Sequence, residues 1–307
     1  MKKIIILRYG DGELANQLWN YISIYAYGLE KNIPVFNPSF YEYHVHFKLV
    51  DRESWIIRLL AKLFENYTNR KQGYLKKFCR KAYQIYPFLI KIISKGNLIS
   101  SDDPSNKIIY LPPTNLDFRS NITNNKIYFN GWLFRNPKGL EKYRNEIIKA
   151  FCPKDEITER VHGIISSLFA KYKKVIGLHI RQGDYKTFKG GQYFVTEKRF
   201  REIVDEYVKR NGIDSNSTCF LITSDGPIDP KTFNGLNIYI SKENAVTDLF
   251  LLSATDTIIG SDSTFGDFAS WYGDIPHIIA TNNPIDWNYY STRRVYFENK
   301  YCTMVHY

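Results

Sequence analysis

The stretch LHIRQGDY, residues 178–185, closes an apolar run, KVIGLHI, that spans residues 174–180. Side chains of a β-strand alternate between its two faces, so Leu178 and Ile180 would enter a core while His179 and Arg181 project from the other side. A lone histidine or arginine is more often structural than functional. Two of them at the end of one buried strand, with Asp184 close behind, indicate a ligand site.

Apolar strands and helices alternate along the second half of the chain. The runs typical of strands span 174–180, 217–225, 236–241, 256–260 and 275–280, and those typical of helices span 156–172, 196–212, 246–255 and 265–273. Such alternation predicts a parallel sheet with helices on both faces. Ligands of these sheets bind at the carboxyl ends of the strands, where the polar clusters of this chain also fall. These clusters are Asp11 with Asn16, His179 to Asp184, Ser224 with Asp225, and Ser261 to Thr264.

The first half opens as a strand, a turn, a helix and a strand within residues 4–36, which predicts a βαβ unit. A further strand is expected over 125–134 and a helix over 138–151. We therefore expect an α/β protein with two Rossmann-like domains, residues 1–152 and 153–307.

Composition favours a globular protein, since 44% of the 307 residues are hydrophobic and 24% are charged. The N-terminal apolar run ends at Leu7, so neither a signal peptide nor a membrane-spanning helix is expected, and the predicted location is cytoplasmic. The cysteines are far apart in the sequence, which argues against a disulfide framework or a structural zinc site. They are Cys79, Cys152, Cys219 and Cys302.

Most of the formal charge of +11 comes from a segment at about 50–96. Between Arg52 and Gly96 this basic segment has eleven basic and two acidic residues, a net charge of +9, together with two apolar stretches. It is expected to be helical. Its function could be peripheral contact with an anionic membrane or a phosphorylated ligand, or it could be an insertion of solvated helices. No motif supports a nucleic-acid partner.

Three hydroxyl residues, Ser261, Ser263 and Thr264, lie between an apolar strand and a helix that is expected to begin near Phe265. Hydroxyls and free N–H groups at a helix N-terminus can bind a phosphate, although ordinary capping would explain one of them.

A turn with the spacing Gly10-x-Gly12-x-x-Ala15 follows the first strand. The spacing matches the dinucleotide fingerprint, but Asp11 and Glu13 would place carboxylates beside a pyrophosphate. The glycines could merely permit a tight turn, or the turn could bring Asn16 and a carboxylate close to a sugar.

Arg181 is suited to neutralise a leaving diphosphate, because a guanidinium is permanently charged and can fork onto phosphate oxygens. His179 could bind the ligand or orient Arg181. Asp184 could anchor the loop or meet a sugar hydroxyl.

Five segments together resemble the bacterial α-1,2-fucosyltransferases, glycosyltransferase family 11, with related patterns in α-1,6- and protein O-fucosyltransferases. LHIRQGDY is similar to H-x-R-R-x-D-Y, and GELANQLWNYISIYAYG to the opening G-G-L-G-N-Q-x-F-Q-Y-A. FNGWLFRNPKGLEKYRNEI is similar to G-Y-x-Q-x-x-x-Y-F, FLITSDGP to F-x-x-F-S-D-D, and DLFLLSATDTIIGSDSTFGDFASWYG to D-x-x-L-M-S-x-C-x-x-x-I-x-x-N-S-T-F-S-W-W. The resemblance extends from the first strand to about Gly273, apart from the basic segment.

The resemblance implies a GT-B arrangement, in which two Rossmann-like halves face each other across a cleft and GDP-fucose is bound mainly by the second. It implies an inverting transfer of L-fucose, without a cofactor or an obligatory metal. The expected acceptor is a galactose-type hydroxyl, reached in α-1,2 linkage, on an oligosaccharide or lipid-linked glycan such as an O-antigen unit. An enzyme of this kind would lie in the cytoplasm, and the basic segment could hold it at the inner membrane face.

The resemblance also implies roles for single residues. Arg181 would contact the β-phosphate, His179 would line the donor site, and Asp248 would approach the guanine. Asn16 would reach the donor from the first half. The other donor-binding candidates in the matching motifs are Ser224, Asp225, Ser261, Ser263, Thr264 and Phe265.

The chain departs from the family pattern at three places. Gln182 replaces a second arginine, Glu13 replaces a glycine, and GDF replaces SWW after Phe265. A nucleotide-sugar-binding protein without turnover, or a transferase of another nucleotide sugar, therefore remain alternatives. Asp11, Glu13 and Asp184 are carboxylates that could deprotonate the acceptor, and the sequence does not choose among them.

Overall fold

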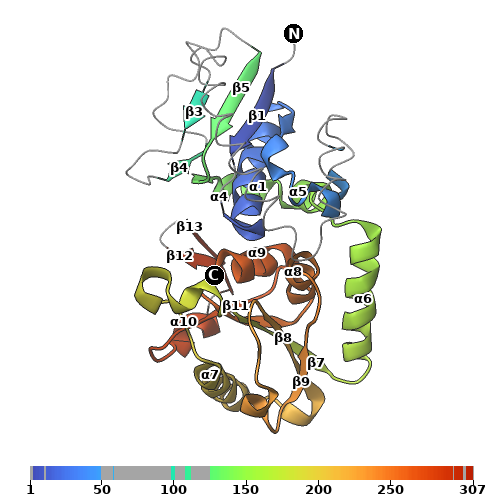
Figure 1. The fold of residues 1–307 in the computed structure, drawn as a ribbon, viewed down its shortest axis with the longest axis vertical. Helices are drawn as coiled ribbons and strands as arrows, with labels where there is room; N and C mark the ends of the chain where they lie inside the picture. Colours follow the sequence, from blue (N-terminus) through green and yellow to red (C-terminus); the bar gives the residue numbers. More distant parts are fainter. Residues whose placement is uncertain are drawn as a thin grey trace. The chain divides into compact units, whose positions relative to one another are not determined.

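The computed structural model describes residues 3–9, 12–49, 58, 98–100, 108–111, 125–292, 294–299 and 302–306. The chain divides into two compact units, Met1–Lys154 and Asp155–Tyr307, whereas the sequence places the boundary between residues 152 and 153. In Figure 1 the N-terminal unit is coloured from blue to green and the C-terminal unit from yellow-green to red. The base candidate Asp11 and, apart from Arg58, the basic segment lie outside the described residues.

The N-terminal unit contains a parallel sheet with the strand order β2-β1-β5-β3 and a second, two-stranded parallel sheet of β4 and β6. The predicted βαβ opening is present and runs from β1 through α1 to β2. The elements of this unit are β1 (Ile4–Tyr9), α1 (Leu14–Lys31), β2 (Val35–Phe36), η1 (Pro38–Phe40), η2 (His44–His46), β3 (Leu98–Ser100), β4 (Ile109–Tyr110), β5 (Lys126–Asn130), β6 (Phe134–Arg135), α4 (Pro137–Lys142) and α5 (Arg144–Ala150).

Two predicted elements of this unit are each divided. The strand expected over 125–134 ends at Asn130, because Gly131 has a φ of +113° and turns the chain. The side chain of Asn20 in α1 holds the turn: its Nδ2 donates to the Gly131 carbonyl (3.1 Å) and its Oδ1 accepts from the Phe134 N–H (3.3 Å). The helix expected over 138–151 is interrupted at Tyr143, where the backbone leaves the helical region.

The C-terminal unit contains a five-stranded parallel sheet with the order β11-β10-β7-β8-β9, and β12 and β13 form a separate antiparallel pair. The alternation of strands and helices read from the sequence is confirmed. Its elements are α6 (Asp155–Phe169), β7 (Lys174–Ile180), η4 (Asp184–Lys186), η5 (Phe188–Gly191), α7 (Glu197–Arg210), η6 (Ser215–Ser217), β8 (Thr218–Ser224), η7 (Pro230–Phe233), β9 (Asn237–Ile240), α8 (Ala245–Ser253), β10 (Thr257–Ser261), α9 (Thr264–Gly273), β11 (His277–Ala280), α10 (Trp287–Thr292), β12 (Arg294–Asn299) and β13 (Cys302–His306).

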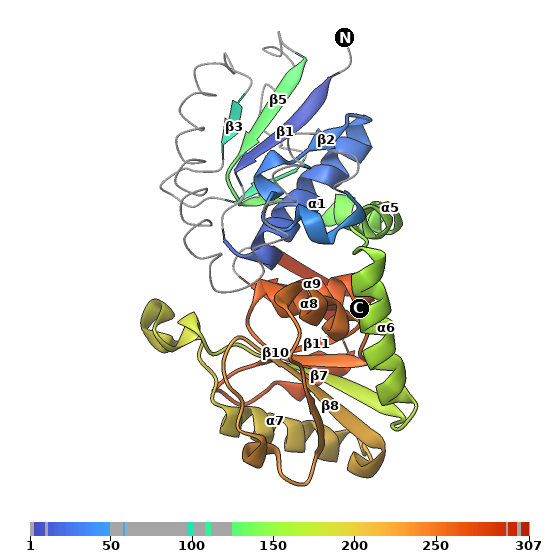
Figure 2. The same cartoon turned by 45° about the vertical axis from the view of Figure 1, so that its right-hand side comes forward.

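Helices cover both faces of this sheet (Figure 2). On one face Leu178 and Ile180 of β7 are fully buried in a core that includes Phe200 and Val204 of α7. Residues two apart on a strand share a face, so Gly177 and His179 belong to the opposite face, which α8 and α9 cover. The predicted assignment of Leu178 and Ile180 to the core is therefore confirmed.

Among the described residues no helix is long and apolar enough to cross a membrane. Cys152 and Cys219 are free thiols.

Candidate functional site

The strand order of the C-terminal sheet defines where a ligand would bind. The chain runs from β7 outward to β8 and β9, and then returns to β10 on the other side of β7. In a doubly wound sheet this reversal opens a crevice at the carboxyl ends of the two central strands. Arg181 follows β7 and Ser261 ends β10, and the Arg181 N–H donates to Ser261 Oγ at 3.0 Å. The two strand ends named by the sequence are therefore joined at the switch point.

The guanidinium of Arg181 is held in place by three neighbours. Its Nε donates to Asp184 Oδ1 at 3.0 Å, and its Nη2 lies 2.9 Å from the same oxygen. Asp225 Oδ2 is 3.8 Å from Nε, and the guanidinium carbon lies 4.9 Å from the centre of the Tyr185 ring. No hydrogen bond from Nη1 occurs within the described residues. The edge of the guanidinium formed by Nε and Nη2 is thus held by Asp184, and the edge with Nη1 can bind a ligand.

Asp225 shapes the loop that carries Arg181, and Ser224 shapes the neighbouring loop after β8. Asp225 Oδ1 accepts the N–H groups of Gln182 (2.6 Å) and Gly183 (3.0 Å). A Cβ at Gly183 would lie 2.7 Å from Asp225 Oδ2, so the close approach needs glycine. Ser224 Oγ accepts the Gly226 N–H at 3.1 Å. The structure therefore gives both donor-binding candidates contacts that build these loops.

Gln182 is buried and hydrogen-bonded within the unit. Its Nε2 donates to Glu197 Oε1 (2.9 Å) and to the Pro227 carbonyl (3.0 Å). This side chain connects the loop to the start of α7 rather than adding a polar group to the Arg181 cluster.

Helix α9 begins at the crevice. Ser263 is its N-cap, and its Oγ accepts the Phe265 N–H at 3.3 Å, with Thr264 as the first helical residue. A helix N-terminus carries a partial positive charge and unpaired N–H groups, which together favour an anion. Tyr185 ties the loop to this turn, because its hydroxyl donates to the Asp262 carbonyl at 2.8 Å. Burial raises the pKa of Tyr185 to about 12, so the phenol stays protonated.

His179 lies buried beneath the crevice and is stacked on Phe265, with ring centres 5.0 Å apart and planes at 24°. Its Nδ1 is fully buried and makes no hydrogen bond to the part of the chain that the structure describes, so Nε2 is the ring nitrogen that can reach a ligand. Burial lowers the pKa of His179 to about 3, and the charges of His277 and Arg181 act in the same direction. The imidazole is therefore neutral near pH 7.

Asp248 lies on the first turn of α8, after the edge strand β9, where it accepts a hydrogen bond from the Ser241 hydroxyl. Burial raises the pKa of Asp248 to about 7, against the lowering effect of that hydrogen bond. The carboxyl group is thus poised between its two protonation states, and a ligand that donates hydrogen bonds would favour the ionised one.

Glu13 and Asn16 belong to the N-terminal unit, at the turn from β1 into α1. Gly12 has a φ of +83°, and a Cβ there would lie 2.5 Å from Asn16 Nδ2. Glu13 Oε2 accepts the Tyr43 hydroxyl at 3.0 Å, and Gln17 Nε2 donates to the Gly12 carbonyl at 3.0 Å. The turn therefore carries an amide, Asn16, packed against Gly12 and a carboxylate, Glu13, bound to Tyr43. The glycine is required there by both conformation and space.

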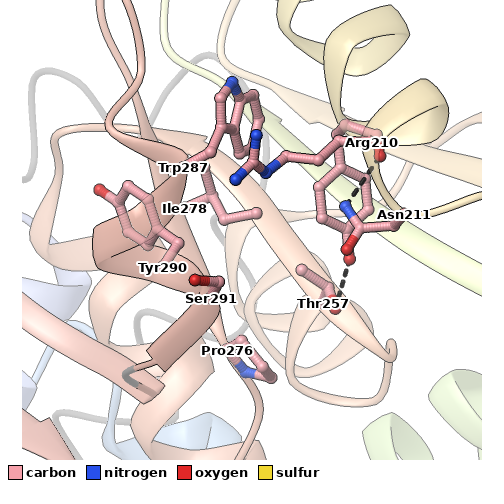
Figure 3. A pocket seen from close by; sticks show the side chains of 9 residues that line it. Arg210, Asn211, Thr257, Pro276, Ile278, Trp287, Tyr290 and Ser291 are labelled. Atoms are coloured by element: carbon pink, nitrogen blue, oxygen red, sulfur yellow. Dashed lines mark hydrogen bonds between the residues drawn. The ribbon is translucent and has the colours of Figure 1, made fainter.

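A separate cavity of about 250 Å³ lies at the opposite, amino-terminal end of the C-terminal sheet (Figure 3). Its polar groups bond to the protein itself: Arg210 Nη2 donates to Asn288 Oδ1 (2.9 Å) and Asn211 Nδ2 to the Tyr207 carbonyl (2.8 Å). We assign it no ligand. The lining residues are Tyr207, Arg210, Asn211, Thr257, Pro276, Ile278, Trp287, Tyr290 and Ser291.

The sequence assigned no role to three residues near the strand ends. The Tyr185 hydroxyl binds the Asp262 carbonyl, and Asp267 Oδ1 lies 3.0 Å from His277 Nδ1. Asp267 could have been noticed as a lone carboxylate within an otherwise apolar helix, TFGDFASWYG, whereas nothing in the sequence pairs it with His277. Within the described ranges, no three His, Cys, Asp or Glu side chains come together as a potential metal site.

Neither a protein-family model nor a curated protein matches this chain. Solved structures of fucosyltransferases share its fold. An Arabidopsis thaliana FUT1 mutant in complex with GDP is 13% identical, with a TM-score of 0.51 over 91% of this chain and 70% of that one. The NodZ α-1,6-fucosyltransferase soaked with GDP-fucose is 12% identical, with a TM-score of 0.51 over 91% of this chain and 95% of that one. Fucosyltransferase NodZ from Bradyrhizobium is 14% identical, with a TM-score of 0.50 over 91% and 96%.

These likenesses establish the fold. The chain has the α/β fold, with parallel sheets and flanking helices, of the GT-B fucosyltransferases.

Proposed function

We propose that this chain is an inverting glycosyltransferase that transfers L-fucose from GDP-fucose to a hydroxyl of a glycan acceptor. The observation that carries the proposal is the junction of β7 and β10 at the switch point of the sheet, where the Arg181 cation and the N-terminus of α9 can face the same anion. The fold supports the choice of donor, because structures that share it were determined with GDP or GDP-fucose.

In the proposed complex the diphosphate of GDP lies in this crevice. Arg181 contacts the β-phosphate, and the N-terminal turn of α9 faces the remaining phosphate oxygens. His179 adds an uncharged donor from below. Negative charge grows on the diphosphate as the bond to fucose breaks. These preorganised groups therefore stabilise the transition state more than the bound substrate, which lowers the barrier.

Asp248 is proposed to recognise the guanine. An ionised carboxylate accepts hydrogen bonds from the two neighbouring N–H groups on the Watson–Crick edge of guanine. The pKa of about 7 places the apo carboxyl group near its midpoint at neutral pH, and the guanine donors would stabilise the charged form.

The transfer itself follows from the inverting geometry. The acceptor oxygen forms a bond to C1 of fucose from the face opposite GDP, while the bond from C1 to the β-phosphate oxygen breaks and GDP departs with that electron pair. The hydroxyl proton passes to a carboxylate. Asp184 is already bound to Arg181, so we favour Glu13 of the N-terminal unit over Asp184, with Asp11 as the other candidate. We propose that Asn16, also of the N-terminal unit, positions the sugar. The scheme requires no metal ion.

The α-1,2 linkage to a galactose-type hydroxyl, and a surface-glycan or O-antigen acceptor, rest on the motif resemblance. A cytoplasmic enzyme that modifies a lipid-linked glycan would work at an anionic membrane face. The basic segment, with its net charge of +9, suits such a face. Wild-type protein should then bind anionic liposomes at low salt, and charge reversal at Lys76, Lys77, Arg80 and Lys81 should abolish that binding; equal binding by the two proteins would contradict membrane contact.

The alternative of a nucleotide-sugar-binding protein without turnover is favoured by one observation. The position of the second family arginine is taken by Gln182, whose amide is bound to Glu197 and Pro227. The site therefore has one guanidinium fewer with which to stabilise the leaving group.

The decisive experiment measures fucose transfer and GDP-fucose hydrolysis by purified protein, with a galactose-terminated acceptor. Arg201→Ala is a matched control for Arg181→Ala: the Arg201 side chain is 26% exposed and paired with Asp205, and the Arg181 side chain is 24% exposed and paired with Asp184. We expect turnover in the wild type and in Arg201→Ala, and none in Arg181→Ala. GDP binding without hydrolysis or transfer would favour the binding protein, and turnover with a UDP-sugar alone would favour another donor.

A further inference from the structure

The loop that follows Arg181 carries three aromatic rings that contact one another. This loop, residues 184–194, includes η4 and η5 and is the yellow segment that projects at the left of Figure 2, between β7 and α7. The rings of Tyr185 and Phe188 are stacked, with centres 6.1 Å apart and planes at 16°. The Tyr193 ring lies 5.9 Å from each of them. These three rings form the aromatic cluster.

One end of the aromatic cluster is fixed to the anion site, and the other end is exposed. The Tyr185 hydroxyl donates to the Asp262 carbonyl at 2.8 Å, and the Tyr185 ring lies 4.9 Å from the guanidinium carbon of Arg181. Phe188, by contrast, is 45% exposed. Burial of an apolar ring is favourable, so an exposed ring that adjoins a polar site offers binding energy to a ligand. The cluster therefore extends the site from Arg181 to the protein surface.

The backbone after Phe188 turns sharply and fixes the place of its ring. Lys189 has a φ of +48°, and Gly190 and Gly191 continue the left-handed turn with φ values of +72° and +79°. A left-handed conformation costs free energy at a residue with a Cβ, such as Lys189. The turn brings Gly191 so close to the Lys186 carbonyl that a Cβ there would lie 3.0 Å from the oxygen. Phe188 is thus presented by a constrained turn.

Hydrogen-bond donors border the exposed ring. The ammonium of Lys189 lies 5.4 Å from the centre of the Phe188 ring and 5.9 Å from that of Tyr193. Lys186 Nζ lies 5.8 Å from the Phe194 ring on the same loop. A pyranose ring matches this pattern, because its C–H groups can lie on an aromatic face while its hydroxyls bond to donors at the edge of that face.

We propose that the aromatic cluster is a subsite for the acceptor glycan, in which one pyranose ring stacks on the exposed surface of Phe188. The inference rests on the proposed function, because the acceptor must lie beside the sugar whose diphosphate Arg181 contacts. The contact between Tyr185 and Arg181 makes the cluster continuous with that site, which favours a glycan over a lipid surface.

The stacking predicts a preference among sugars. A β-galactoside carries the hydrogens of C3, C4 and C5 on one face of its ring, whereas a β-glucoside, its epimer at C4, has the C4 hydrogen on the opposite face. The galactoside therefore offers the aromatic ring a larger apolar face and should bind more tightly.

The test uses saturation-transfer NMR with methyl β-galactoside and methyl β-glucoside on nucleotide-free protein. In the wild type we expect the strongest transfer to the C3, C4 and C5 hydrogens of the galactoside, and weaker transfer to the glucoside. Phe188→Ala should weaken galactoside binding about tenfold, and Phe188→Tyr should retain it. Phe169→Ala is the matched control, since Phe169 ends α6 of the same unit, is 40% exposed and should leave galactoside binding unchanged.

Kinetic and binding measurements distinguish the acceptor from other occupants. Phe188→Ala should raise KM for a galactoside acceptor about tenfold, while its affinities for GDP and GDP-fucose stay within about twofold of the wild type. Weaker binding of GDP-fucose at unchanged GDP affinity would assign the ring to the donor sugar and overturn the inference. So would a loss of binding to vesicles of phosphatidylglycerol and phosphatidylcholine at unchanged galactoside binding, which would identify a membrane contact.

Absence of galactoside binding by the folded wild type, or equal binding by the wild type and Phe188→Ala, would also overturn the subsite. Equal losses in Phe188→Ala and Phe169→Ala would do the same, because they would show a nonspecific effect of removing an exposed ring. Saccharide binding is measured without nucleotide, so failure of the wild type to bind GDP would contradict the proposed function instead.

Discussion

The same local architecture, a turn from a central parallel strand into a helix, is used in both units with opposite chemistry. At the end of β10 the turn into α9 is capped by a serine hydroxyl and accompanied by Arg181. At the end of β1 the turn into α1 has Glu13 at the N-cap, without a side-chain capping bond, and Asn16 in its first turn. The turn into α9 suits an anion, and the turn into α1 suits hydroxyl groups and a proton.

In the proposed transferase, this difference would separate two tasks. Leaving-group stabilisation needs fixed positive charge, and acceptor activation needs a carboxylate that is not neutralised by that charge. Asp184 illustrates the conflict, because its Oδ1 is bound to Arg181 at 3.0 Å. This conflict is the reason that we propose Glu13, which does not share a unit with Arg181, as the base.

The largest effect is expected from removing the guanidinium of the anion site. Arg181→Ala should lower kcat/KM for GDP-fucose by at least about a thousandfold, because charge on the departing diphosphate loses its only guanidinium among the groups we assign to it. Arg181→Lys should recover part of the loss, since an ammonium supplies the charge without the planar fork. Steady-state kinetics with Arg201→Ala as the control measures both. Wild-type turnover in Arg181→Ala would remove the anion site from the mechanism.

A smaller effect, on turnover rather than on GDP binding, is expected from a change at Asn16 in the N-terminal unit. Asn16→Ala should lower kcat by about 10- to 100-fold, the loss expected for one or two hydrogen bonds to a reacting sugar. GDP affinity should stay within about twofold of the wild type, because the contacts that we propose for the diphosphate all belong to the C-terminal unit. A parallel fall of GDP affinity, measured by calorimetry, would show that the two tasks are not divided in this way.

The two units should also respond differently to acid. Burial lowers the pKa of His44 in the N-terminal unit to about 4, so between that value and the ordinary pKa of about 6.5 the unfolded chain binds a proton that the native chain does not. Neutral His44 therefore lowers the free energy of unfolding only in acid: this free energy is at its full value above pH 6.5 and decreases as the pH falls. By pH 5 the loss is about 2 kcal/mol.

In the C-terminal unit His179 and His277 act in the same direction as His44. Asp248 opposes them, because its pKa of about 7 makes the native state bind the extra proton from about pH 4 to pH 7. His44→Gln should therefore reduce the loss of unfolding free energy between pH 7.5 and pH 5 by about 2 kcal/mol. Denaturant titrations of both proteins at the two pH values measure this change. An identical pH dependence would mean that His44 is not held neutral.

The smallest expected effect separates capping from anion binding. Ser263→Ala should cost about 1 kcal/mol of stability and weaken GDP binding several-fold, because the cap also orders the N–H groups that face the diphosphate. Thr196→Ala removes the equivalent cap of α7, where Oγ1 accepts the Arg199 N–H at 3.2 Å, and serves as the control. It should cost similar stability and leave GDP binding unchanged. Equal GDP affinity in both variants would reduce Ser263 to an ordinary cap.

The sequence was sufficient where the signal is local. The strands and helices of the C-terminal unit follow from apolar runs bounded by polar turns, and the place of Arg181 follows from the end of such a run. The cap at Ser263 could be read in the same way, because an N-cap depends on residues within one turn.

The sequence was insufficient where contacts join distant residues. The division of the predicted strand at Gly131 depends on Asn20, more than a hundred residues earlier. Asp225 reaches Gln182 and Gly183 across neighbouring strand ends, and His277 reaches Asp267 from a strand to a helix. These partners are fixed by strand register and helix packing, which a list of residues does not contain.

Calorimetric titration of GDP into the wild type, Arg181→Ala and Arg201→Ala tests most directly whether the end of β7 and the start of α9 form the diphosphate site. We predict one GDP site in the wild type, an affinity about a hundredfold weaker in Arg181→Ala, and wild-type affinity in Arg201→Ala. UDP and NAD should bind more weakly than GDP. Absence of GDP binding by the folded wild type, or equal GDP affinity in the wild type and Arg181→Ala, would contradict the account.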